Sequence, residues 1–395
     1  MAHAASVMAM GQRESSAQVV IIGGGAAGLA AAAAAAGLGA DTVILEQNDR
    51  VGKKLLRTGN GRCNLTNMNL SPDGYNHPEF TAPLLEKIGP ERLLAWFSDL
   101  GLWTAPDEEG RVYPCSGAAA SVLDVLRLAC EKRGVTTRTG FSVSSVSRGK
   151  RGFRIEGPEG EIVHAGCVIV AAGGGTRLAE SLGHSVTPFV PVLCPLRTDT
   201  SAIRGLSGVR VRCRGTLLDR AGLAVASEEG ELLFRDYGVS GVMAFDLSRY
   251  LPQGKTLSLD LAPERSFAEL RDELSVRAAD GYAPAEYFTG AFRRGVAEAL
   301  LRYAGSVKPA ALARAIKDFR LEVRGAAETG QAQVTRGGVK VKEFDPLTLR
   351  SSRVPGLYVV GEALDIDGRC GGYNLHWAFV SGLAAGTHAA GGELL

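Results

Sequence analysis

The residue pattern with the clearest chemical meaning consists of three glycines, Gly23, Gly25 and Gly28, spaced as G-x-G-x-x-G. They follow the apolar run 19–22 and open an alanine-rich stretch. In such a pattern the first glycine allows a tight turn, the second lets the backbone approach a pyrophosphate, and the third lets a helix pack closely on a strand. The spacing therefore predicts that N–H groups at a helix N-terminus bind the pyrophosphate of a dinucleotide.

An acidic residue adds a second part to this predicted site. Glu46 ends the next apolar run, about 20 residues after the glycines, where a carboxylate accepts hydrogen bonds from ribose hydroxyls. A carboxylate there repels a ribose phosphate, which leaves FAD or NAD as the cofactor. FAD is favoured because the chain has no second such fingerprint, and because glycines at 361 and 371–372 offer a distant contact for the far end of a long cofactor. The alternative is a glycine-rich turn that binds nothing.

The elements that would hold these residues form a strand–helix–strand unit, with strands at 19–22 and 42–45 and a helix at 26–36. Alanine is the best helix former, and its small side chain lets a helix lie close to a sheet. A second strand followed by glycines, at 167–175, and a last strand at 357–360 are expected to join the same sheet.

The middle of the chain reads differently from both ends. Short apolar runs separated by turn residues at about 190–260 predict a β-barrel or sandwich, and helical patterns follow at 266–318. Ser266 and Glu269 form a capping box at the expected start of the first of these helices. The middle segment therefore reads as an insertion between two parts of one nucleotide-binding domain.

Composition excludes several classes of protein. The 395 residues include 44 Lys and Arg against 42 Asp and Glu, and this net charge of +2 gives no general attraction for a polyanion, so no nucleic-acid partner is expected. Seven scattered cysteines without a C-x-x-C and six histidines predict no metal site and a reducing, cytoplasmic location. The chain has no membrane-spanning apolar stretch and no signal peptide is expected, so no membrane partner is expected. The expected partner is a small-molecule substrate. The oligomeric state is left open.

Longer motifs carry a resemblance to a known family. They are GKKLLRTGNGRCNLTN at 52–67, GRVYP at 110–114, AQVTRGGV at 332–339 and the stretch 356–386, which contains GLYVVGEALDIDGRCGGYNL. With these motifs in order along almost the whole chain, it resembles the bacterial BaiN-like, or YhiN-like, flavoproteins. These are NAD(P)/FAD-dependent oxidoreductases, also called aminoacetone oxidase-family FAD-binding enzymes.

The resemblance implies an α/β fold: a Rossmann-like FAD-binding domain with an inserted β-barrel domain and a helical sub-insert. The expected boundaries are 1–17 for a flexible N-terminal extension, 18–190 and 337–395 for the two parts of the FAD-binding domain, 191–264 and 321–336 for the β-barrel insert, and 265–320 for the helical sub-insert.

The resemblance also implies where FAD lies. Loop 59–64 would face the isoalloxazine, 361–362 the ribityl chain and pyrophosphate, Val143 the adenine, and 371–374 the flavin pyrimidine. A helix N-terminus at the pyrimidine would stabilise the negative charge of reduced flavin and raise its potential. The full set of expected FAD-binding residues is Gly23, Gly25, Ala26, Ala27, Gly28, Glu46, Gln47, Lys53, Lys54, Gly59, Asn60, Gly61, Arg62, Cys63, Asn64, Val143, Ala172, Gly173, Gly174, Gly361, Glu362, Gly371, Gly372, Tyr373 and Asn374.

Four residues are candidates for catalysis. Arg62 would stabilise reduced flavin or bind an anionic substrate group, or would only position its loop. Tyr373 and Tyr237 would donate protons, or would pack. His376 would be an acid–base group, or a hydrogen-bonded core residue; family members commonly have glutamine there. The segment 235–242 also lacks the histidine and proline that family members have.

The predicted function is reduction of an activated C=C bond in an apolar cyclic substrate, such as a dehydro bile acid or steroid, with FAD bound and NAD(P)H as transient donor. The C-terminal motif lacks the arginine of fumarate reductases, since Leu375 follows Asn374, so a dicarboxylate substrate is not expected. The alternatives are an amine or aminoketone oxidase that uses oxygen, a flavin-dependent RNA-modifying protein, and a flavin-carrying protein without turnover.

Overall fold

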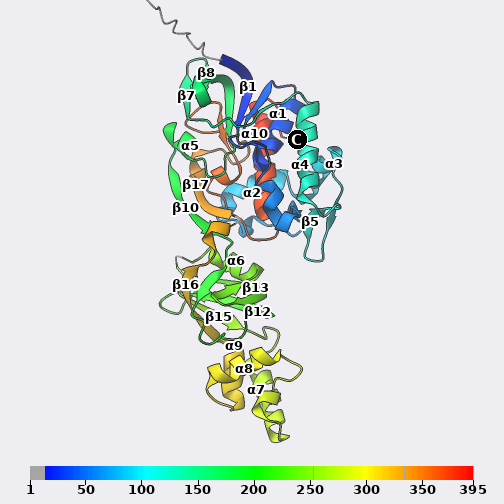
Figure 1. Cartoon of the computed structure of the whole chain (residues 1–395), viewed down its shortest axis with the longest axis vertical. Helices are drawn as coiled ribbons and strands as arrows, with labels where there is room; N and C mark the ends of the chain where they lie inside the picture. Colours follow the sequence, from blue (N-terminus) through cyan, green and yellow to red (C-terminus); the bar gives the residue numbers. More distant parts are fainter. Residues whose placement is uncertain (1–13, 252, 333, 395) are drawn as a thin grey trace, which may run out of the picture. The chain divides into compact units, whose positions relative to one another are not determined.

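The computed structural model describes residues 14–251, 253–332 and 334–394 (Figure 1). Most of the predicted extension 1–17 lies outside these residues, but β1 (Glu14–Ile22) begins at Glu14, so 14–17 belong to a strand. The chain forms two compact units. One comprises the described residues up to Phe189 and from Arg336 onward, and the other comprises Val190–Thr335.

A seven-stranded sheet is the centre of the first unit, in the order β6-β2-β1-β9-β8-β7, with β18 also paired to β9. Strands β6, β2, β1, β9 and β18 run parallel to one another. Strands β7 and β8 pair in the antiparallel direction, β7 with β8 and β8 with β9. Because both faces of the parallel part are covered, Val19 to Ile22 are all buried. The bounds are β2 (Thr42–Leu45), β6 (Thr136–Arg138), β7 (Ser145–Gly149), β8 (Gly152–Glu156), β9 (Ile162–Val170) and β18 (Leu357–Val359).

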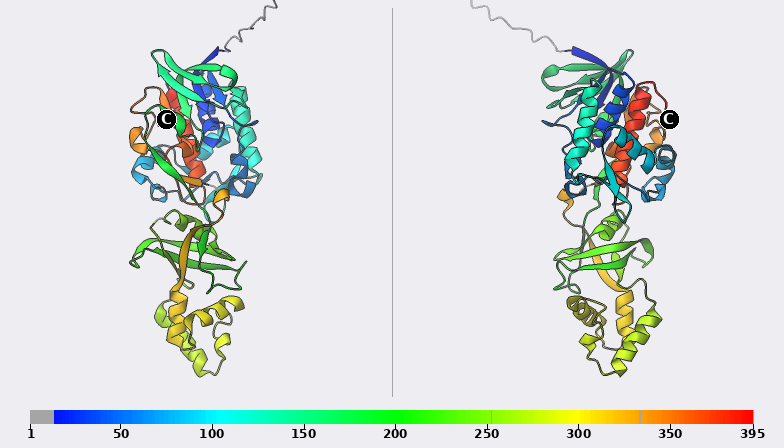
Figure 2. Two further views of the ribbon diagram at one scale, coloured as in Figure 1. Left: turned by 60° about the vertical axis from the view of Figure 1, so that its left-hand side comes forward. Right: turned by 90° about the vertical axis from the view of Figure 1, so that its right-hand side faces the viewer.

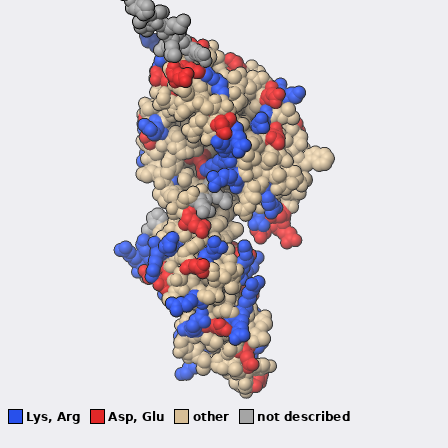
Figure 3. Space-filling view, viewed as in Figure 1, with Lys and Arg blue, Asp and Glu red and all other residues tan. Residues whose placement is uncertain are grey.

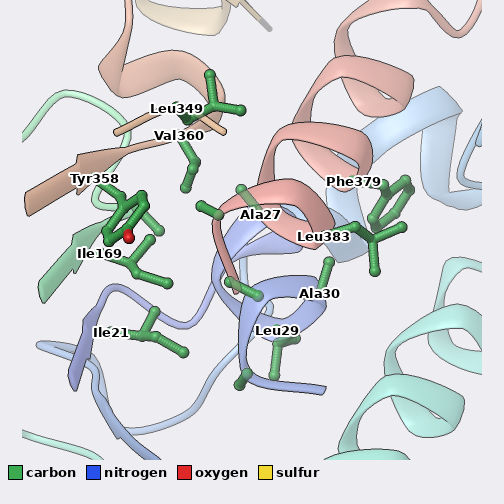
Figure 4. Close-up of a cluster of buried hydrophobic side chains, with 14 of the residues drawn as sticks. Ile21, Ala27, Leu29, Ala30, Ile169, Leu349, Tyr358, Val360, Phe379 and Leu383 are labelled. Carbon is green, nitrogen blue, oxygen red and sulfur yellow. The ribbon is translucent and has the colours of Figure 1, made fainter. Parts of the chain in front are cut away.

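Two helices pack on this sheet with their backbones in contact. They are α1 (Ala26–Gly37) and α10 (Tyr373–Ala389), and Figure 4 shows Ala27 and Ala30 of α1 beside α10 in the buried core. A Cβ atom on Gly382 would lie 2.2 Å from the carbonyl oxygen of Ala27, and one on Gly386 would lie 2.2 Å from that of Ala31. The alanine run therefore serves close helix packing, since a larger side chain on either helix would separate them.

Replacing Gly386 by alanine should destabilise the protein by about 2 kcal/mol, because the added methyl group cannot fit against the Ala31 carbonyl. Urea denaturation of the two proteins measures the difference. The control is Gly37→Ala in α1, where the new Cβ would meet only the flexible end of Arg133 at 3.3 Å. Equal stabilities of the two variants would contradict the packing argument.

The rest of the first unit surrounds these layers (Figure 2). A small sheet pairs β3 (Thr66–Asn67) with β5 (Arg111–Pro114), and β5 with β4 (Thr104–Pro106). The other helices are α2 (Pro78–Lys87), α3 (Pro90–Asp99), α4 (Ala119–Lys132) and α5 (Arg177–Ser181). A two-stranded sheet pairs β10 (Val186–Val192) with β17 (Val334–Val339), and the residues of both strands are divided between the two units.

The second unit is a closed barrel in the order β11-β14-β13-β12-β15-β16. Three helices stand between β15 and β16, and Ser266 and Glu269 form the predicted capping box at the start of α7. The predicted fold class, with its inserted barrel and helical sub-insert, is therefore confirmed. The bounds are β11 (Leu196–Thr198), β12 (Arg210–Leu218), β13 (Ala224–Arg235), β14 (Gly238–Ser240), α6 (Val242–Ser248), β15 (Thr256–Asp260), α7 (Phe267–Ala279), α8 (Arg294–Ala304), α9 (Pro309–Lys317) and β16 (Phe319–Ala326).

Candidate dinucleotide and active site

The three fingerprint glycines occupy the turn from β1 into α1, and each is there for a different reason. Gly23 has φ +106°, and a Cβ on it would lie 2.7 Å from the carbonyl oxygen of Ala171. A Cβ on Gly28 would lie only 1.9 Å from the carbonyl oxygen of Gly23. A Cβ on Gly25, in contrast, would meet no atom within 4 Å. Packing requires the first and third glycines, while the second faces open space, which fits a pyrophosphate at this turn.

Glu46 directly follows β2, is buried, and points at the fingerprint turn. Its Oε2 accepts a hydrogen bond from the backbone N–H of Gly24 at 2.7 Å. Its Oε1 accepts from the backbone N–H of Asn48 at 2.8 Å and from the Asn48 side-chain amide at 2.5 Å. A carboxylate has roughly four acceptor positions, so these bonds fix the group and leave capacity for a ribose hydroxyl. Gln47, the next predicted contact, is exposed.

Gly361 lies beside the start of α1. A Cβ on Gly361 would lie 3.1 Å from the Cβ of Ala27. Its N–H donates to the hydroxyl of Ser381 at 3.0 Å, and its carbonyl oxygen accepts from the indole N–H of Trp377 at 3.3 Å. Two α10 side chains therefore fix this backbone next to Ala26 and Ala27, the first residues of α1.

The lysines predicted to neutralise a pyrophosphate have carboxylate partners. Lys54 forms an ion pair with Glu362, and Lys53 forms one with Asp49 at 2.5 Å. A Cβ on Gly173 would lie 3.8 Å from Oε2 of Glu362, which places the glycines after β9 near this ion pair. Each of these two lysines therefore has a carboxylate partner within the protein.

Loop 59–64 has an unusual backbone. Gly59 and Asn60 both have φ near +55°, and Cys63 has φ +56°. Burial raises the pKa of the Cys63 thiol to about 12, so this side chain is protonated at neutral pH. Arg62 is exposed, and its guanidinium carbon lies 4.1 Å from the centre of the Tyr113 ring. That cation–π contact holds Arg62 at the loop surface and leaves it able to meet a ligand.

The residues after this loop bind the start of α10. With its side-chain amide oriented to satisfy both partners, Asn64 accepts from the N–H of Gly372 at 3.1 Å and donates to the carbonyl of Thr66 at 3.0 Å. The Asn67 amide donates to the carbonyl of Gly371 at 3.0 Å. A Cβ on Gly372, whose φ is +104°, would lie 2.5 Å from the Thr66 carbonyl. The loop at 59–67 and the start of α10 thus form one fixed arrangement.

The helices α1 and α10 run parallel, because Gly382 meets Ala27 and Gly386 meets Ala31. Helix α10 begins at Tyr373, nine residues before the level of Ala27, which is about 14 Å at 1.5 Å per residue. The N-termini of α1 and α10 therefore point in the same direction, and that of α10 extends beyond that of α1 along their common axis. This spacing fits an extended dinucleotide with its pyrophosphate at α1 and a group that gains negative charge at α10.

Tyr373 and Asn374 pack into the protein at the start of α10. The hydroxyl of Tyr373 donates to the carbonyl of Asn69 at 3.3 Å, and its ring centre lies 5.4 Å from that of Tyr75. The Asn374 amide accepts from the N–H of Gly368 at 2.8 Å and donates to its carbonyl at 2.9 Å. These bonds favour structural roles for both side chains.

His376 is fully buried and has a partner at each ring nitrogen. Its Nε2 lies 3.1 Å from the carbonyl oxygen of Ile88, and its Nδ1 lies 2.8 Å from the hydroxyl of Thr66. A carbonyl only accepts, so Nε2 carries the proton and Nδ1 accepts from Thr66. Burial lowers the pKa of His376 to about 4. This geometry opposes the acid–base role considered from the sequence and favours the core alternative.

The buried His376 should make the protein sensitive to acid. Its pKa is about 4 when folded and about 6.5 when unfolded, so below pH 6.5 the unfolded chain binds the proton first. Stability is therefore lost as the pH falls, by about 2 kcal/mol between pH 7 and pH 5. Urea denaturation at several pH values measures this loss.

The control is His376→Gln, whose amide keeps a donor and an acceptor but does not titrate. Other acidic groups titrate equally in both proteins, so the difference between the two pH profiles isolates His376. Superimposable profiles would contradict the assignment.

The remaining two predicted residues lie in different units. Val143 is half-buried between β6 and β7. Tyr237 belongs to the second unit, in the turn between β13 and β14. Burial and a hydrogen bond with Glu328 raise the pKa of Tyr237, and the Arg235 guanidinium lies 5.8 Å from its ring centre.

A polar network that the sequence analysis missed holds the segment leading into α10. Arg336 donates from Nε and Nη2 to the two carboxylate oxygens of Asp367, at 2.7 and 3.0 Å. Asp365 Oδ1 accepts from the N–H of Gly337 at 3.2 Å, and the Asn76 side chain binds the backbone of both acidic residues. The sequence signal for this network is the motif at 332–339, which contains Arg336 and Gly337.

Two further features are absent from the residues that the structure describes. Among them, no three His, Cys, Asp or Glu side chains are grouped so that they could hold a metal ion. No helix within that part of the chain combines the length and hydrophobicity that crossing a membrane requires.

Comparison with known proteins places the chain in a family. Residues 17–388 match the family described as HI0933-like protein Rossmann domain. The chain is 36% identical over 384 residues to the 3-dehydro-bile acid delta(4,6)-reductase of Clostridium scindens, covering 89% of this chain and 93% of that protein. It is 28% identical over 382 residues to the ribosomal RNA dihydrouridine synthase of Escherichia coli, covering 88% and 91% respectively.

A solved structure shares the fold. The 3-ketosteroid-delta4-(5alpha)-dehydrogenase from Rhodococcus jostii, in complex with 4-androstene-3,17-dione, has a TM-score of 0.51 and 17% identity, covering 98% of this chain and 99% of that one. The family match, the identity to a reductase and this shared fold agree with the site geometry. The chain therefore belongs to the HI0933-like protein Rossmann domain family, as a BaiN-like, FAD-dependent oxidoreductase.

Proposed function

We propose that this protein reduces a carbon–carbon double bond conjugated to a carbonyl group in an apolar cyclic substrate of the dehydro bile acid or steroid type. We further propose NAD(P)H as the electron donor. The observation that carries the proposal is the 36% identity, across 93% of its length, to a protein named as a 3-dehydro-bile acid delta(4,6)-reductase.

The chemistry of such a reduction suits the groups described above. Bound FAD supplies hydride transfer. The substrate's β-carbon gains a hydride and its α-carbon a proton, while negative charge develops on the carbonyl oxygen. Arg62, exposed on the loop that precedes Asn64, is the cation we propose to meet that charge. The absence of an arginine after Asn374 supports a substrate without a dicarboxylate, since half-buried Leu375 is there.

A second candidate is reduction of a pyrimidine double bond in RNA, which is also conjugated to a carbonyl group. The relative from Escherichia coli is named as a ribosomal RNA dihydrouridine synthase. Figure 3 shows lysines and arginines spread over one face of the second unit, among uncharged and acidic residues. Arg293, Lys308 and Arg314, around α8 and α9, are exposed and have no ion-pair partner among the described residues. Unpaired cations of this kind suit a phosphate backbone.

One anaerobic experiment separates these candidates. The purified protein is reduced with NADH or NADPH, freed of excess donor, and mixed with a conjugated dienone of the bile acid type, with uridine-containing ribosomal RNA, or with buffer. The return of the oxidised flavin absorbance is followed in each case. We expect the dienone to reoxidise the flavin at least tenfold faster than RNA or buffer.

Other outcomes point elsewhere. Faster reoxidation by RNA, with formation of dihydrouridine, would favour the second candidate. Peroxide formation from aminoacetone and oxygen, without NAD(P)H, would favour an oxidase. A reduced protein that neither the dienone nor RNA reoxidises would overturn both reductase proposals.

A further inference from the structure

The start of α10 is held by strand β3 from two directions. Just before the first residue of α10, a Cβ on Gly372 would lie 2.5 Å from the Thr66 carbonyl. The Asn67 side-chain amide donates to the carbonyl of Gly371 at 3.0 Å. One turn further along α10, the ring Nδ1 of His376 accepts a hydrogen bond from the Thr66 hydroxyl at 2.8 Å. The backbone N–H of His376 donates to the Gly372 carbonyl at 2.9 Å. Thr66 therefore packs against the backbone of Gly372 and forms a hydrogen bond with the side chain of His376.

The hydrogen bond between Thr66 and His376 is shielded from water. Thr66 and His376 are both fully buried. The far nitrogen of the histidine is fixed by the carbonyl of Ile88 at 3.1 Å, so the ring cannot rotate without losing a buried hydrogen bond. Packing and hydrogen bonds thus determine the direction of the backbone at Gly371 and Gly372, where φ is +99° and +104°.

We propose that Thr66, held by His376, is a positioning residue that sets the reduction potential of bound FAD. The proposal rests on the FAD site assigned above, with the flavin pyrimidine at the start of α10. Stabilisation of charge by a helix N-terminus falls off within the first turn and depends on the direction of its N–H groups. A change at Thr66 therefore alters how strongly the protein binds the negatively charged, reduced form relative to the oxidised form.

The test is Thr66→Val, which keeps the shape of the side chain but removes the hydroxyl that His376 accepts from. We expect the preference for reduced over oxidised FAD to fall about tenfold, which lowers the midpoint potential by about 30 mV for a two-electron couple. Thr66→Ser restores the hydroxyl and should restore the potential. Titration of the holoprotein against reference dyes measures these values without any substrate.

A matched control comes from the other end of the same helix. Tyr358 binds His388 of α10 at 2.8 Å, so Tyr358→Phe removes a bond of the same length. We expect this control to lose stability and keep the wild-type potential. The inference is overturned if Thr66→Val retains FAD with an unchanged potential, or if Tyr358→Phe shifts the potential equally.

A second pair of variants decides the question if Thr66→Val does not fold. His376→Gln keeps an acceptor for Thr66 and a donor for Ile88, and should keep the potential. His376→Leu removes both and should lower it, and equal potentials would overturn the inference. Because the titration uses no enone, failure to reduce a conjugated double bond would refute the proposed function alone. An unchanged potential in a holoprotein that reduces the dienone would refute this inference alone.

Discussion

Replacing Gly28 by alanine should give a colourless protein that no longer retains FAD. The new Cβ would lie 1.9 Å from the carbonyl oxygen of Gly23, a distance that no real contact shows, so α1 must move away from β1. The N–H groups at the helix start then lose their position. Loss of two hydrogen bonds to a charged pyrophosphate, at about 1.5–3 kcal/mol each, corresponds to an affinity at least roughly 100-fold lower. The flavin-to-protein ratio after purification and titration of the apoprotein with FAD measure the loss.

A neighbouring glycine separates the two causes. Gly25→Ala introduces no clash within the protein, because no atom lies within 4 Å of the new Cβ, and its φ of −81° suits alanine. We therefore expect wild-type stability of the apoprotein together with weakened FAD binding, whereas Gly28→Ala should lose both. An FAD content in Gly28→Ala equal to that of the wild type would contradict the assigned role of the third glycine.

The fingerprint could be predicted because its physical reasons are local. Gly23 and Gly28 touch each other across a single turn, so a short stretch of sequence contains both partners of the contact. Glu46 could be predicted for a related reason: it ends the strand beside β1, and adjacent parallel strands bring their carboxyl ends together. The sequence pattern predicted a β-barrel or sandwich for the middle of the chain, and the strand order that closes the barrel is visible only in the structure.

The roles of other residues depend on partners far away in the chain. The sequence left an acid–base role open for His376 beside a role in the core, because its partners Thr66 and Ile88 lie far away in the chain. Lys54 is a predicted neighbour of the pyrophosphate, and the sequence does not reveal that Glu362, another predicted FAD-binding residue, lies beside it. In both cases the chemistry of the side chain is clear from the sequence, but its partner lies about 300 residues away in the chain.

The spacing of the glycines in α10 indicates a surface for close helix packing, but it does not identify the helix that packs there. Gly382 and Gly386 are four residues apart, so they lie on one face of a helix and let another backbone approach. The alanine run of α1 is the complementary surface, but nothing local indicates that these two segments pair. Their contact sets the offset between the two helix N-termini, and that offset is what fits the site to an extended cofactor.

The buried ion pair behind α10 is expected to have the second large effect. Asp367 is fully buried and receives both hydrogen bonds of a bidentate contact from Arg336, at 2.7 and 3.0 Å. Asp367→Asn keeps the volume but turns amide hydrogens toward a guanidinium group that can only donate. Breaking one side of a buried pair costs about 3–5 kcal/mol. Because the Arg336 side chain is 28% exposed and reaches some water, we expect the lower end, about 3 kcal/mol, in urea denaturation.

A double variant tests whether this loss of stability comes from leaving the Arg336 charge without a carboxylate partner. Arg336→Met combined with Asp367→Leu removes both charges and fills the space with apolar atoms, so it should be more stable than Asp367→Asn alone. Arg336→Met alone should be destabilised, because Asp367 then remains buried without that partner. If the double variant lost the sum of the effects of Arg336→Met and Asp367→Leu measured singly, the two residues would act independently, and the argument that the cost comes from leaving one charge of the pair without its partner would be wrong.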